Sequence, residues 1–105
     1  MQPQGHVQIL MNLIDFGMNV QAAGDAPRVS HSGSATPTGA PADGVGSVSV
    51  EAGIGDDVIE KLRARGHRVA RARGYGGYQG IRIDWEQNAL HGATESRKDG
   101  AAVGY

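Results

Sequence analysis

The stretch from Gly5 to Met18 constrains the fold most, because apolar residues surround most of its circumference when it is drawn as a helix. One apolar stripe consists of Val7, Leu10, Met11, Ile14 and Met18, and a second stripe beside it consists of Ile9, Leu13, Phe16 and Val20. Fully burying one Leu or Ile is worth about 1.5–3 kcal/mol. Leaving one stripe in water would therefore cost more than the usual free energy of unfolding of a small domain, about 5–15 kcal/mol. The pattern predicts a buried helix that needs cover on both faces.

The length and charge of the chain exclude several classes of protein. Its 105 residues are enough for a single domain, 1–105, with one modest core. A net charge of −1 gives no bulk attraction to nucleic acid or to an anionic membrane, so neither is an expected partner. The chain has no cysteine, which excludes disulfides and a thiol nucleophile. A basic run in the middle of the chain is interpreted as solvated rather than phosphate-binding; it comprises Arg63, Arg65, Arg68, Arg71 and Arg73.

The chain shows no targeting or membrane-spanning segment in its sequence. Met1 is followed by Gln-Pro-Gln-Gly-His rather than by a basic segment and an apolar run. The apolar stretch near the start is too short and too interrupted to span a bilayer. Made as it stands, the chain is expected in the cytoplasm.

The first half of the chain predicts one long helix, one short helix and a loop. Residues 1–5 are expected to be a non-helical lead-in, because Pro3 and Gly5 disfavour helix. A short helix is predicted at 19–25, with Asn19 as its N-cap. Residues 30–46 are rich in Ser, Gly and Pro and predict a flexible loop.

The second half predicts strands around one further helix. Alternating valines at 45, 48 and 50 predict a half-buried strand, and residues 53–65 predict a helix closed by Gly66. A strand is expected at 67–73 with Val69 pointing inward. Residues 78–84 and 88–94 predict a hairpin, with Trp85 partly exposed in its loop. The expected fold class is α+β, with a small sheet of about four strands and two main helices.

No catalytic, cofactor-binding or metal-binding residues can be assembled from the sequence. The four histidines, at positions 6, 31, 67 and 91, do not have the spacing of a local metal motif. Asp56 and Asp57 are adjacent, so they point to different sides of a helix. The glycine-rich segment 74–77 lacks the Gly-Lys-Ser/Thr ending of a phosphate-binding loop.

Several blocks of the sequence resemble the late part of the small subunit of gamma-glutamyltransferases. The chain is similar to that family along nearly its whole length, and the blocks fall in the family order. The blocks are Met1-Gln-Pro-Gln-Gly-His-Val-Gln8, Asn12-Leu-Ile-Asp-Phe-Gly-Met-Asn19, Asp25-Ala-Pro-Arg28, Leu62-Arg-Ala-Arg-Gly-His67, Gly77-Tyr-Gln-Gly-Ile81, Leu90-His-Gly-Ala93 and Arg97-Lys-Asp-Gly-Ala-Ala-Val-Gly-Tyr105. Only the loop 30–46 has no recognisable counterpart.

The resemblance implies a partial N-terminal nucleophile hydrolase (αββα) fold. Members of the family cleave themselves, and the new N-terminal threonine of the small subunit attacks a gamma-glutamyl carbonyl. A glycine pair supplies the oxyanion hole. The resemblance places all these groups upstream of Met1, whereas Thr36, Thr38 and Thr94 are internal and match no nucleophile motif. This chain is therefore expected to be inactive alone.

The sequence departs from the family pattern in two places, the closing motif and Gly24. The closing motif usually reads Gly-Ala-Ser-Asp-Pro-Arg, but here it is Gly92-Ala-Thr-Glu-Ser-Arg97. Gly24 stands where the family usually has a larger helix residue. Both departures fall on supporting structure and concern the tightness of packing.

Two functional interpretations remain open. In the first, the chain is a non-catalytic C-terminal fragment that packs on the remainder of a parent enzyme acting on glutathione-type substrates, and that parent family is often exported. In the second, it is a stand-alone α/β module that self-assembles or binds a partner. A third interpretation, a residual hydrolase that uses an internal threonine, is the weakest. Because one helix stripe lacks cover, any folded form is expected to be a dimer or swapped assembly.

Overall fold

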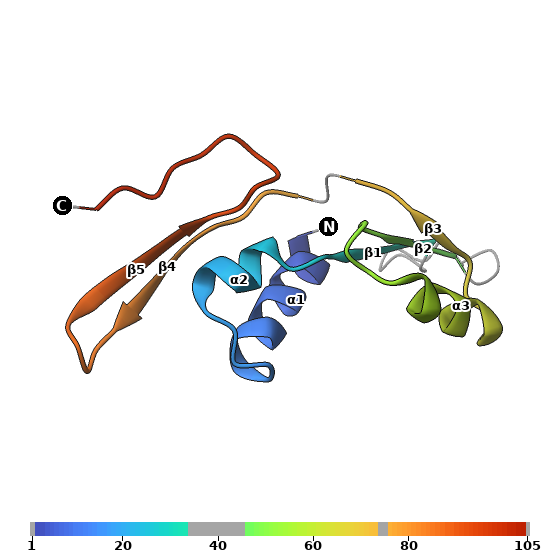
Figure 1. Cartoon of the computed structure of the whole chain (residues 1–105), viewed down its shortest axis with the longest axis horizontal. Helices are drawn as coiled ribbons and strands as arrows, with labels where there is room; N and C mark the ends of the chain where they lie inside the picture. Colours follow the sequence, from blue (N-terminus) through green and yellow to red (C-terminus); the bar gives the residue numbers. More distant parts are fainter. Residues whose placement is uncertain (1, 34–45, 74–75, 105) are drawn as a thin grey trace, which may run out of the picture. The chain divides into compact units, whose positions relative to one another are not determined.

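The computed structural model describes residues 2–33, 46–73 and 76–104, which form two compact units (Figure 1). Unit 1 comprises 1–26 and 76–105, and unit 2 comprises 27–75. Unit 1 contains helices α1 (Gln2–Ile14) and α2 (Val20–Asp25) and strands β4 (Gln79–Asp84) and β5 (Ala89–Thr94). Unit 2 contains strands β1 (Val29–Ser32), β2 (Ser47–Val50) and β3 (Val69–Arg71) and helix α3 (Asp56–Ala64).

Helix α1 begins earlier than the sequence predicted. It starts at Gln2, so the expected non-helical lead-in at 1–5 is wrong. Pro3 is tolerated because it lies in the first turn of α1, where a backbone N–H would have no partner within the helix. Gly5 is likewise carried within the first turns, at the usual cost of about 1 kcal/mol relative to alanine.

One apolar stripe of α1 is exposed in this chain. Val7, Leu10, Met11 and Ile14 keep 55%, 53%, 42% and 75% of their surface accessible. On the second stripe, Ile9 and Leu13 are half-buried. Phe16, which continues the second stripe past the end of α1, is 65% exposed. Within unit 1, α1 is therefore partly covered on one side and bare on the other, as the two-stripe pattern predicted for a chain without further cover.

Helix α2 confirms the predicted short helix and its cap. The Asn19 side chain accepts a hydrogen bond from the Ala22 N–H at 2.8 Å, and the helix ends at Asp25. A turn joins it to α1 (Figure 1). The Asn12 side chain donates to the Ala23 carbonyl at 3.3 Å. Asn12 is one of the few polar residues among the apolar stripes of α1, and its side chain faces α2.

Strands β4 and β5 confirm the predicted hairpin. They pair antiparallel from Gln79↔Thr94 to Asp84↔Ala89. The Asp84 carboxylate accepts hydrogen bonds from the Glu86 and Gln87 amides and so closes the turn. Trp85 lies in that turn with 80% of its surface exposed, as expected. Ala93 is buried, and α2 packs on the hairpin face that carries it.

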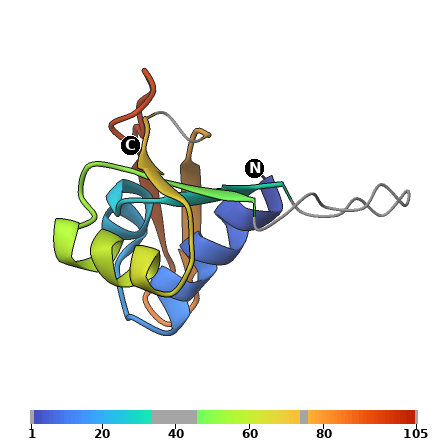
Figure 2. The same cartoon turned by 90° about the vertical axis from the view of Figure 1, so that its right-hand side faces the viewer.

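Unit 2 is a three-stranded sheet covered by α3 on one face (Figure 2). Strand β2 lies in the centre, antiparallel to β1 and parallel to β3. Helix α3 makes the crossover that a parallel pair requires. Val50, Ile59 and Val69 form the buried core between sheet and helix. Gly66, with φ of 92°, closes α3 as predicted, since this left-handed conformation favours glycine.

The strand count differs from the sequence prediction. The expected single sheet of about four strands is instead a three-stranded sheet and a two-stranded hairpin. The extra strand is β1, whose residues 30–32 fall within the segment predicted as the flexible loop 30–46. Ser30 and Ser32 have no strand propensity of their own and are strand only because they pair with Ser49 and Ser47 of β2. Residues 34–45 of that predicted loop lie outside the described residues.

Candidate functional site

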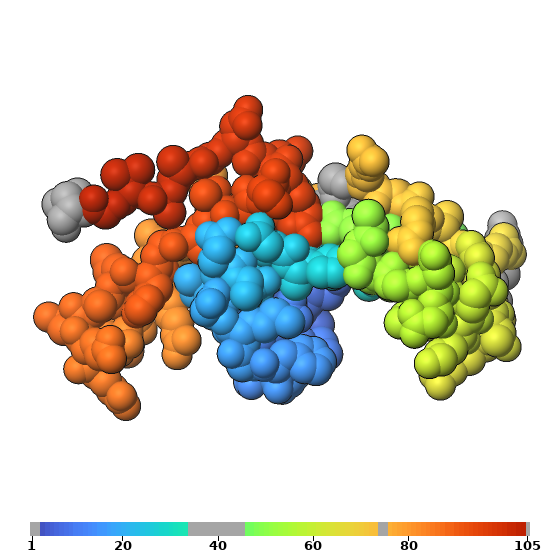
Figure 3. Space-filling view, in the orientation of Figure 1, coloured from blue at the N-terminus to red at the C-terminus, as the bar shows by residue number. Residues whose placement is uncertain are grey.

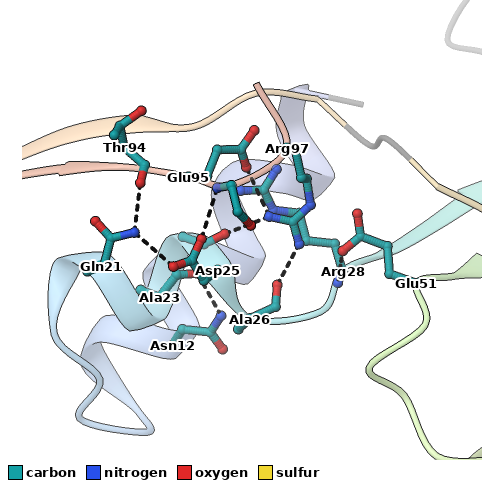
Figure 4. Close-up of polar contacts among 12 residues, drawn as sticks. Asn12, Gln21, Ala23, Asp25, Ala26, Arg28, Glu51, Thr94, Glu95 and Arg97 are labelled. Atoms are coloured by element: carbon teal, nitrogen blue, oxygen red, sulfur yellow. Dashed lines mark hydrogen bonds and ion pairs between the residues drawn. The ribbon is translucent and has the colours of Figure 1, made fainter. Parts of the chain in front are cut away.

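A polar cluster in unit 1 is formed by Gln21, Asp25, Glu95, Ser96 and Arg97, and we call it the tail clasp (Figure 4). Arg97 donates to the Gly24 carbonyl at 2.8 Å and to the Ala26 carbonyl at 2.9 Å. These carbonyls belong to the end of α2, where backbone acceptors lack partners within the helix. The guanidinium thus supplies hydrogen-bond donors to the last carbonyls of α2, and its positive charge interacts favourably with the negative end of the helix dipole.

Arg97 also forms a buried ion pair with Glu95. Its Nη1 lies 3.0 Å from Glu95 Oε2, and the two side chains are 12% and 0% exposed. A charge-assisted bond of this kind is stronger than a neutral one, particularly where water is excluded. The Glu95 N–H donates to the Tyr78 carbonyl at 3.2 Å. Residues 95–97 are therefore hydrogen-bonded both to the end of α2 and to Tyr78, the residue before β4.

The Asp25 carboxylate ties α2 to the same segment from the other side. It accepts hydrogen bonds from the Gln21 side chain at 2.8 Å and from the Ser96 N–H at 3.1 Å. Gln21 also donates to the Thr94 carbonyl at 2.7 Å. The hydrogen bond from Gln21 and then that from Ser96 lower the pKa of Asp25 below its usual range, because both favour the charged form.

Ser96 is one of the departures from the family motif, and its backbone N–H makes a hydrogen bond to Asp25. The family usually has proline at this place, and proline has no N–H to donate. Serine therefore adds the bond to Asp25 that a proline could not make. Glu95, at the position of the usual aspartate, accepts from Arg97 two residues further on. The altered motif is compatible with an ordered tail.

We predict that Gln21→Ala and Ser96→Pro each raise the pKa of Asp25, because each variant removes hydrogen bonding that favours the charged carboxylate. NMR titration of the Asp25 carboxyl carbon measures both changes. The pKa of Asp84 serves as the internal control: it is lowered chiefly by the Gln87 amide at the far turn and should not move in either variant. Equal shifts at Asp25 and Asp84 would contradict the local origin.

The same bonds make the stability of unit 1 depend on pH. Because the pKa of Asp25 is lower in the folded chain than in the unfolded one, its contribution is complete above the unfolded value of about 3.9. That contribution is lost as the pH falls through the lower folded value. Gln21→Ala is therefore expected to flatten the acid limb of a plot of stability against pH.

The histidines considered as metal ligands lie on four separate segments of the chain. His6 lies on α1, His31 on β1, His67 after α3 and His91 on β5. Among residues 2–33, 46–73 and 76–104, no group of three or more His, Asp or Glu side chains is arranged to hold a metal ion. Thr94 is a half-buried strand residue. Thr36, Thr38, Gly74 and Tyr75 lie outside the described residues.

The basic run in unit 2 is partly engaged within the unit. Arg63 pairs with Glu60 at 2.6 Å, and its Nη2 donates to the Val69 carbonyl at 3.0 Å. Arg71 pairs with Asp56 at 2.6 Å, which ties β3 to the first turn of α3. These contacts support the solvated, structural interpretation of the two arginines.

A second buried polar contact lies where β1 and β2 meet. The Glu51 carboxylate accepts from the Arg28 N–H at 2.9 Å, and the Glu51 N–H donates to the Arg28 carbonyl at 3.0 Å. Both residues are buried. This reciprocal pair extends the β1–β2 ladder by one residue and fixes its register (Figure 4).

Sequence reasoning did not single out the tail clasp. Arg97 appeared only as a member of a family motif, and Glu95 and Ser96 only as departures from it. The available signal was the charge pattern, a glutamate and an arginine two residues apart just after a strand. The partner carbonyls on α2 are more than seventy residues away in sequence, so no local pattern predicts them.

Comparison with known proteins identifies the family. The chain matches the gamma-glutamyltranspeptidase family over residues 1–105 and belongs to it. It is 31% identical over 100 residues to the glutathione hydrolase proenzyme of Escherichia coli (strain K12), covering 94% of this chain and 15% of that protein. Its fold is α+β, like that of the N-terminal nucleophile hydrolases of this family.

Solved structures agree with this assignment. The cephalosporin acylase from Bacillus halodurans is 36% identical, with a TM-score of 0.75, and the match covers 98% of this chain and 18% of that one. The gamma-glutamyltranspeptidase from Pseudomonas nitroreducens is 24% identical, with a TM-score of 0.73, and there the match covers 96% of this chain and 48% of that one. The second likeness shows the fold alone.

The chain spans only a small part of its curated relatives, 15% of the Escherichia coli protein. This coverage is consistent with a fragment and with pairing to the rest of such an enzyme. In the described part of the chain, every helix is too short or too polar to cross a membrane.

Proposed function

We propose that this chain is a non-catalytic C-terminal portion of a gamma-glutamyltransferase-like hydrolase and that it serves as scaffold for the remainder. The parent activity would be gamma-glutamyl transfer or hydrolysis on glutathione-type substrates. In the relatives, most of the length lies outside the matched segment, and we place the threonine nucleophile and the oxyanion hole there. Scaffolding matters because a reacting group misplaced by about 1 Å can cost on the order of a hundredfold in rate.

The observation that carries this proposal is the exposed stripe of α1. Val7, Leu10, Met11 and Ile14 are apolar, successive along one face and at least 42% exposed. A contiguous apolar patch of this kind marks an interaction surface. Unit 1 has its own cover for the opposite face of α1, so the bare stripe is the surface that the remainder of the polypeptide would bury.

An activity assay tests the non-catalytic role. The purified 105-residue chain is incubated with a chromogenic gamma-glutamyl anilide, and the released aniline is measured by absorbance. We expect release equal to that of a boiled control. Release above the control that disappears in Thr94→Ala would overturn the proposal and support a hydrolase that uses an internal threonine.

The same stripe also favours the second candidate, a module that self-assembles. We expect the isolated chain to form a dimer or swapped assembly, because a second copy can bury the stripe that unit 1 leaves exposed. Light scattering at micromolar concentration measures this. Ile14→Ser should reduce association, and the matched control Asp15→Ser, at an exposed neighbouring position, should not. A monodisperse wild-type monomer that unfolds cooperatively would contradict self-association.

A further inference from the structure

Asp99 and Gly100 form an aspartyl-glycine pair in the tail that follows β5. Both residues are exposed and lie outside the helices and strands. Glycine has no Cβ, so its backbone rotates freely and its nitrogen is open to a neighbouring group. At such a pair, the backbone nitrogen of the glycine can reach the side-chain carboxyl carbon of the aspartate, which is what the closure of an imide ring requires.

Neither reacting group of this pair is engaged. Within residues 2–33, 46–73 and 76–104, the Asp99 carboxylate makes no hydrogen bond or ion pair, and the Gly100 N–H donates to no acceptor. A groove of about 1090 Å³ lies between the hairpin and residues 101–104. Figures 1 and 3 show the tail running back along the hairpin at the surface of unit 1. The backbone at Asp99 therefore has room to rotate toward a closed ring.

The other described aspartates each have one reacting group engaged. For three of them, the N–H of the next residue donates to a backbone carbonyl, at 3.2, 3.0 and 3.2 Å: Asp15, Asp25 and Asp57. The Asp56 carboxylate pairs with Arg71, and the Asp84 carboxylate accepts from two amides of its turn. Asp43, which also precedes a glycine, lies outside the described residues. Asp99 is therefore the one aspartate in the described part of the chain whose carboxyl group and following amide are both unengaged.

The tail beyond Asp99 fits closely against hairpin β4–β5. Gly100 lies against the paired residues Gln79 and Thr94, where a Cβ would be 2.8 Å from Gln79 Nε2 and 2.7 Å from Thr94 Oγ1. Two residues further on, Ala102 lies against Gly92, where a Cβ would be 3.2 Å from the Ala102 Cβ. An extra backbone carbon at Asp99 would displace the tail by about 1.5 Å, the length of one C–C bond, and move both residues out of register with their partners.

We propose that Asp99 is a modification site, at which the chain isomerises to isoaspartate without an enzyme and thereby releases its tail from the hairpin. In the first step, the Gly100 nitrogen attacks the Asp99 carboxyl carbon. A C–N bond forms, and the hydroxyl of the carboxyl group leaves with the amide proton as water. The product is a succinimide ring.

In the second step, water opens the ring. It adds to the backbone carbonyl carbon of Asp99, and the bond from this carbon to the Gly100 nitrogen breaks as the nitrogen regains a proton. The Asp99 Cγ then carries the peptide bond, and the former backbone carbonyl is a free carboxylate. The product has the mass of the starting chain, but its backbone is longer by one carbon.

The change acts on one side of Asp99 only. Glu95 and Arg97 precede it, so the tail clasp keeps its bonds to Tyr78 and to α2. The contacts of Gly100 and Ala102 follow it and are lost. This chemistry needs only the chain and water, so it goes beyond the proposed function and does not depend on it.

Ageing of the purified 105-residue chain in neutral buffer tests the proposal. Samples are digested with a glutamate-specific protease, which releases residues 96–105 as one peptide. The aspartyl and isoaspartyl forms of this peptide have the same mass and separate by chromatography. Only the aspartyl form is cut by a protease specific for the bond before aspartate. Samples taken over time give the rate of isomerisation at Asp99 and, from the other peptides, at the remaining aspartates.

We expect isoaspartate to accumulate at Asp99 at least ~10-fold faster than at Asp15, because the amide after Asp15 is bonded to the Met11 carbonyl and reacts only on local opening. A synthetic peptide of residues 96–105 should isomerise at the same rate as the folded chain, since the fold engages neither reacting group. Asp99→Glu keeps the charge but would have to close a larger ring, so it should form no isomer at this position.

NMR of fresh and aged samples measures the release of the tail. The nuclear Overhauser effect between the Ala102 methyl group and the Gly92 α-protons should be present in the fresh chain and absent from the isomerised fraction. Aged Asp99→Glu should retain it. Hydrogen exchange at the Glu95 amide, which is bonded to the Tyr78 carbonyl, should not change.

Equal accumulation of isoaspartate at Asp15 and Asp99 would contradict the choice of site, and so would a folded chain that isomerises much more slowly than the free peptide. Isomerisation at Asp99 with the contact between Ala102 and Gly92 retained would show that the tail is not released. Loss of that contact in aged Asp99→Glu would assign the release to a different change.

Discussion

Arg97→Ala is expected to lower the free energy of unfolding of unit 1 by about 3–5 kcal/mol, the range for breaking a buried ion pair from one side. The substitution removes two bonds to α2 carbonyls and the guanidinium beside Glu95, whose side chain is fully buried. Urea unfolding followed by circular dichroism, together with hydrogen exchange at the β5 amides, measures the loss.

Two further variants separate the causes of that loss. Arg82→Ala removes an arginine from an exposed position of β4 and should change stability by less than about 0.5 kcal/mol. Arg97→Lys keeps the charge but not the planar fork of donors, so its effect should lie between wild type and Arg97→Ala. If Arg97→Ala and Arg82→Ala have equal effects, the tail clasp does not stabilise unit 1.

Gly24→Ala is expected to destabilise unit 1 by about 1–3 kcal/mol, the usual cost of overpacking. Alanine is ordinarily better than glycine in a helix by about 1 kcal/mol, so propensity alone predicts the opposite sign. A Cβ at Gly24 would overlap the Tyr78 ring, and even Tyr78 Cγ would lie at 3.2 Å. Thermal unfolding of the variant shows directly whether Gly24→Ala stabilises or destabilises the chain.

A double-mutant cycle tests whether Tyr78 is the cause. In a Tyr78→Ala background, Gly24→Ala should be neutral or stabilising by up to about 1 kcal/mol. Gly104→Ala is the matched control, because no atom lies within 4 Å of a Cβ at that position. The packing explanation fails if Gly24→Ala stabilises the chain that retains Tyr78.

The hairpin and helix α3 were predictable because their signals are local. Alternating residues on either side of a short polar loop predict β4 and β5, and an acidic first turn with a closing glycine predicts α3. Each signal depends on residues within a few positions of one another. The N-cap Asn19 was predictable for the same reason, since its partner is three residues away.

The elements that sequence reasoning missed depend on distant partners. Strand β1 forms from residues 29–32 because β2 offers a ladder to pair with. The space at Gly24 is filled by Tyr78, and the acceptors of Arg97 lie on α2. The two contacts in unit 1, Gly24 with Tyr78 and α2 with Arg97, join the start of the chain to its end. No local sequence pattern predicts contacts between such distant residues.

The α+β class and the two apolar stripes of α1 could be predicted from short-range periodicity, and the family could be recognised from blocks of sequence that resemble it. The tertiary structure was needed to show which stripe of α1 is covered, which hairpin residues are exposed and which carbonyls Arg97 bonds. The physical reason is that burial and hydrogen-bond pairing are properties of segments brought together in space. A residue type shows what a side chain can bury or bond, and the fold decides whether a partner is there.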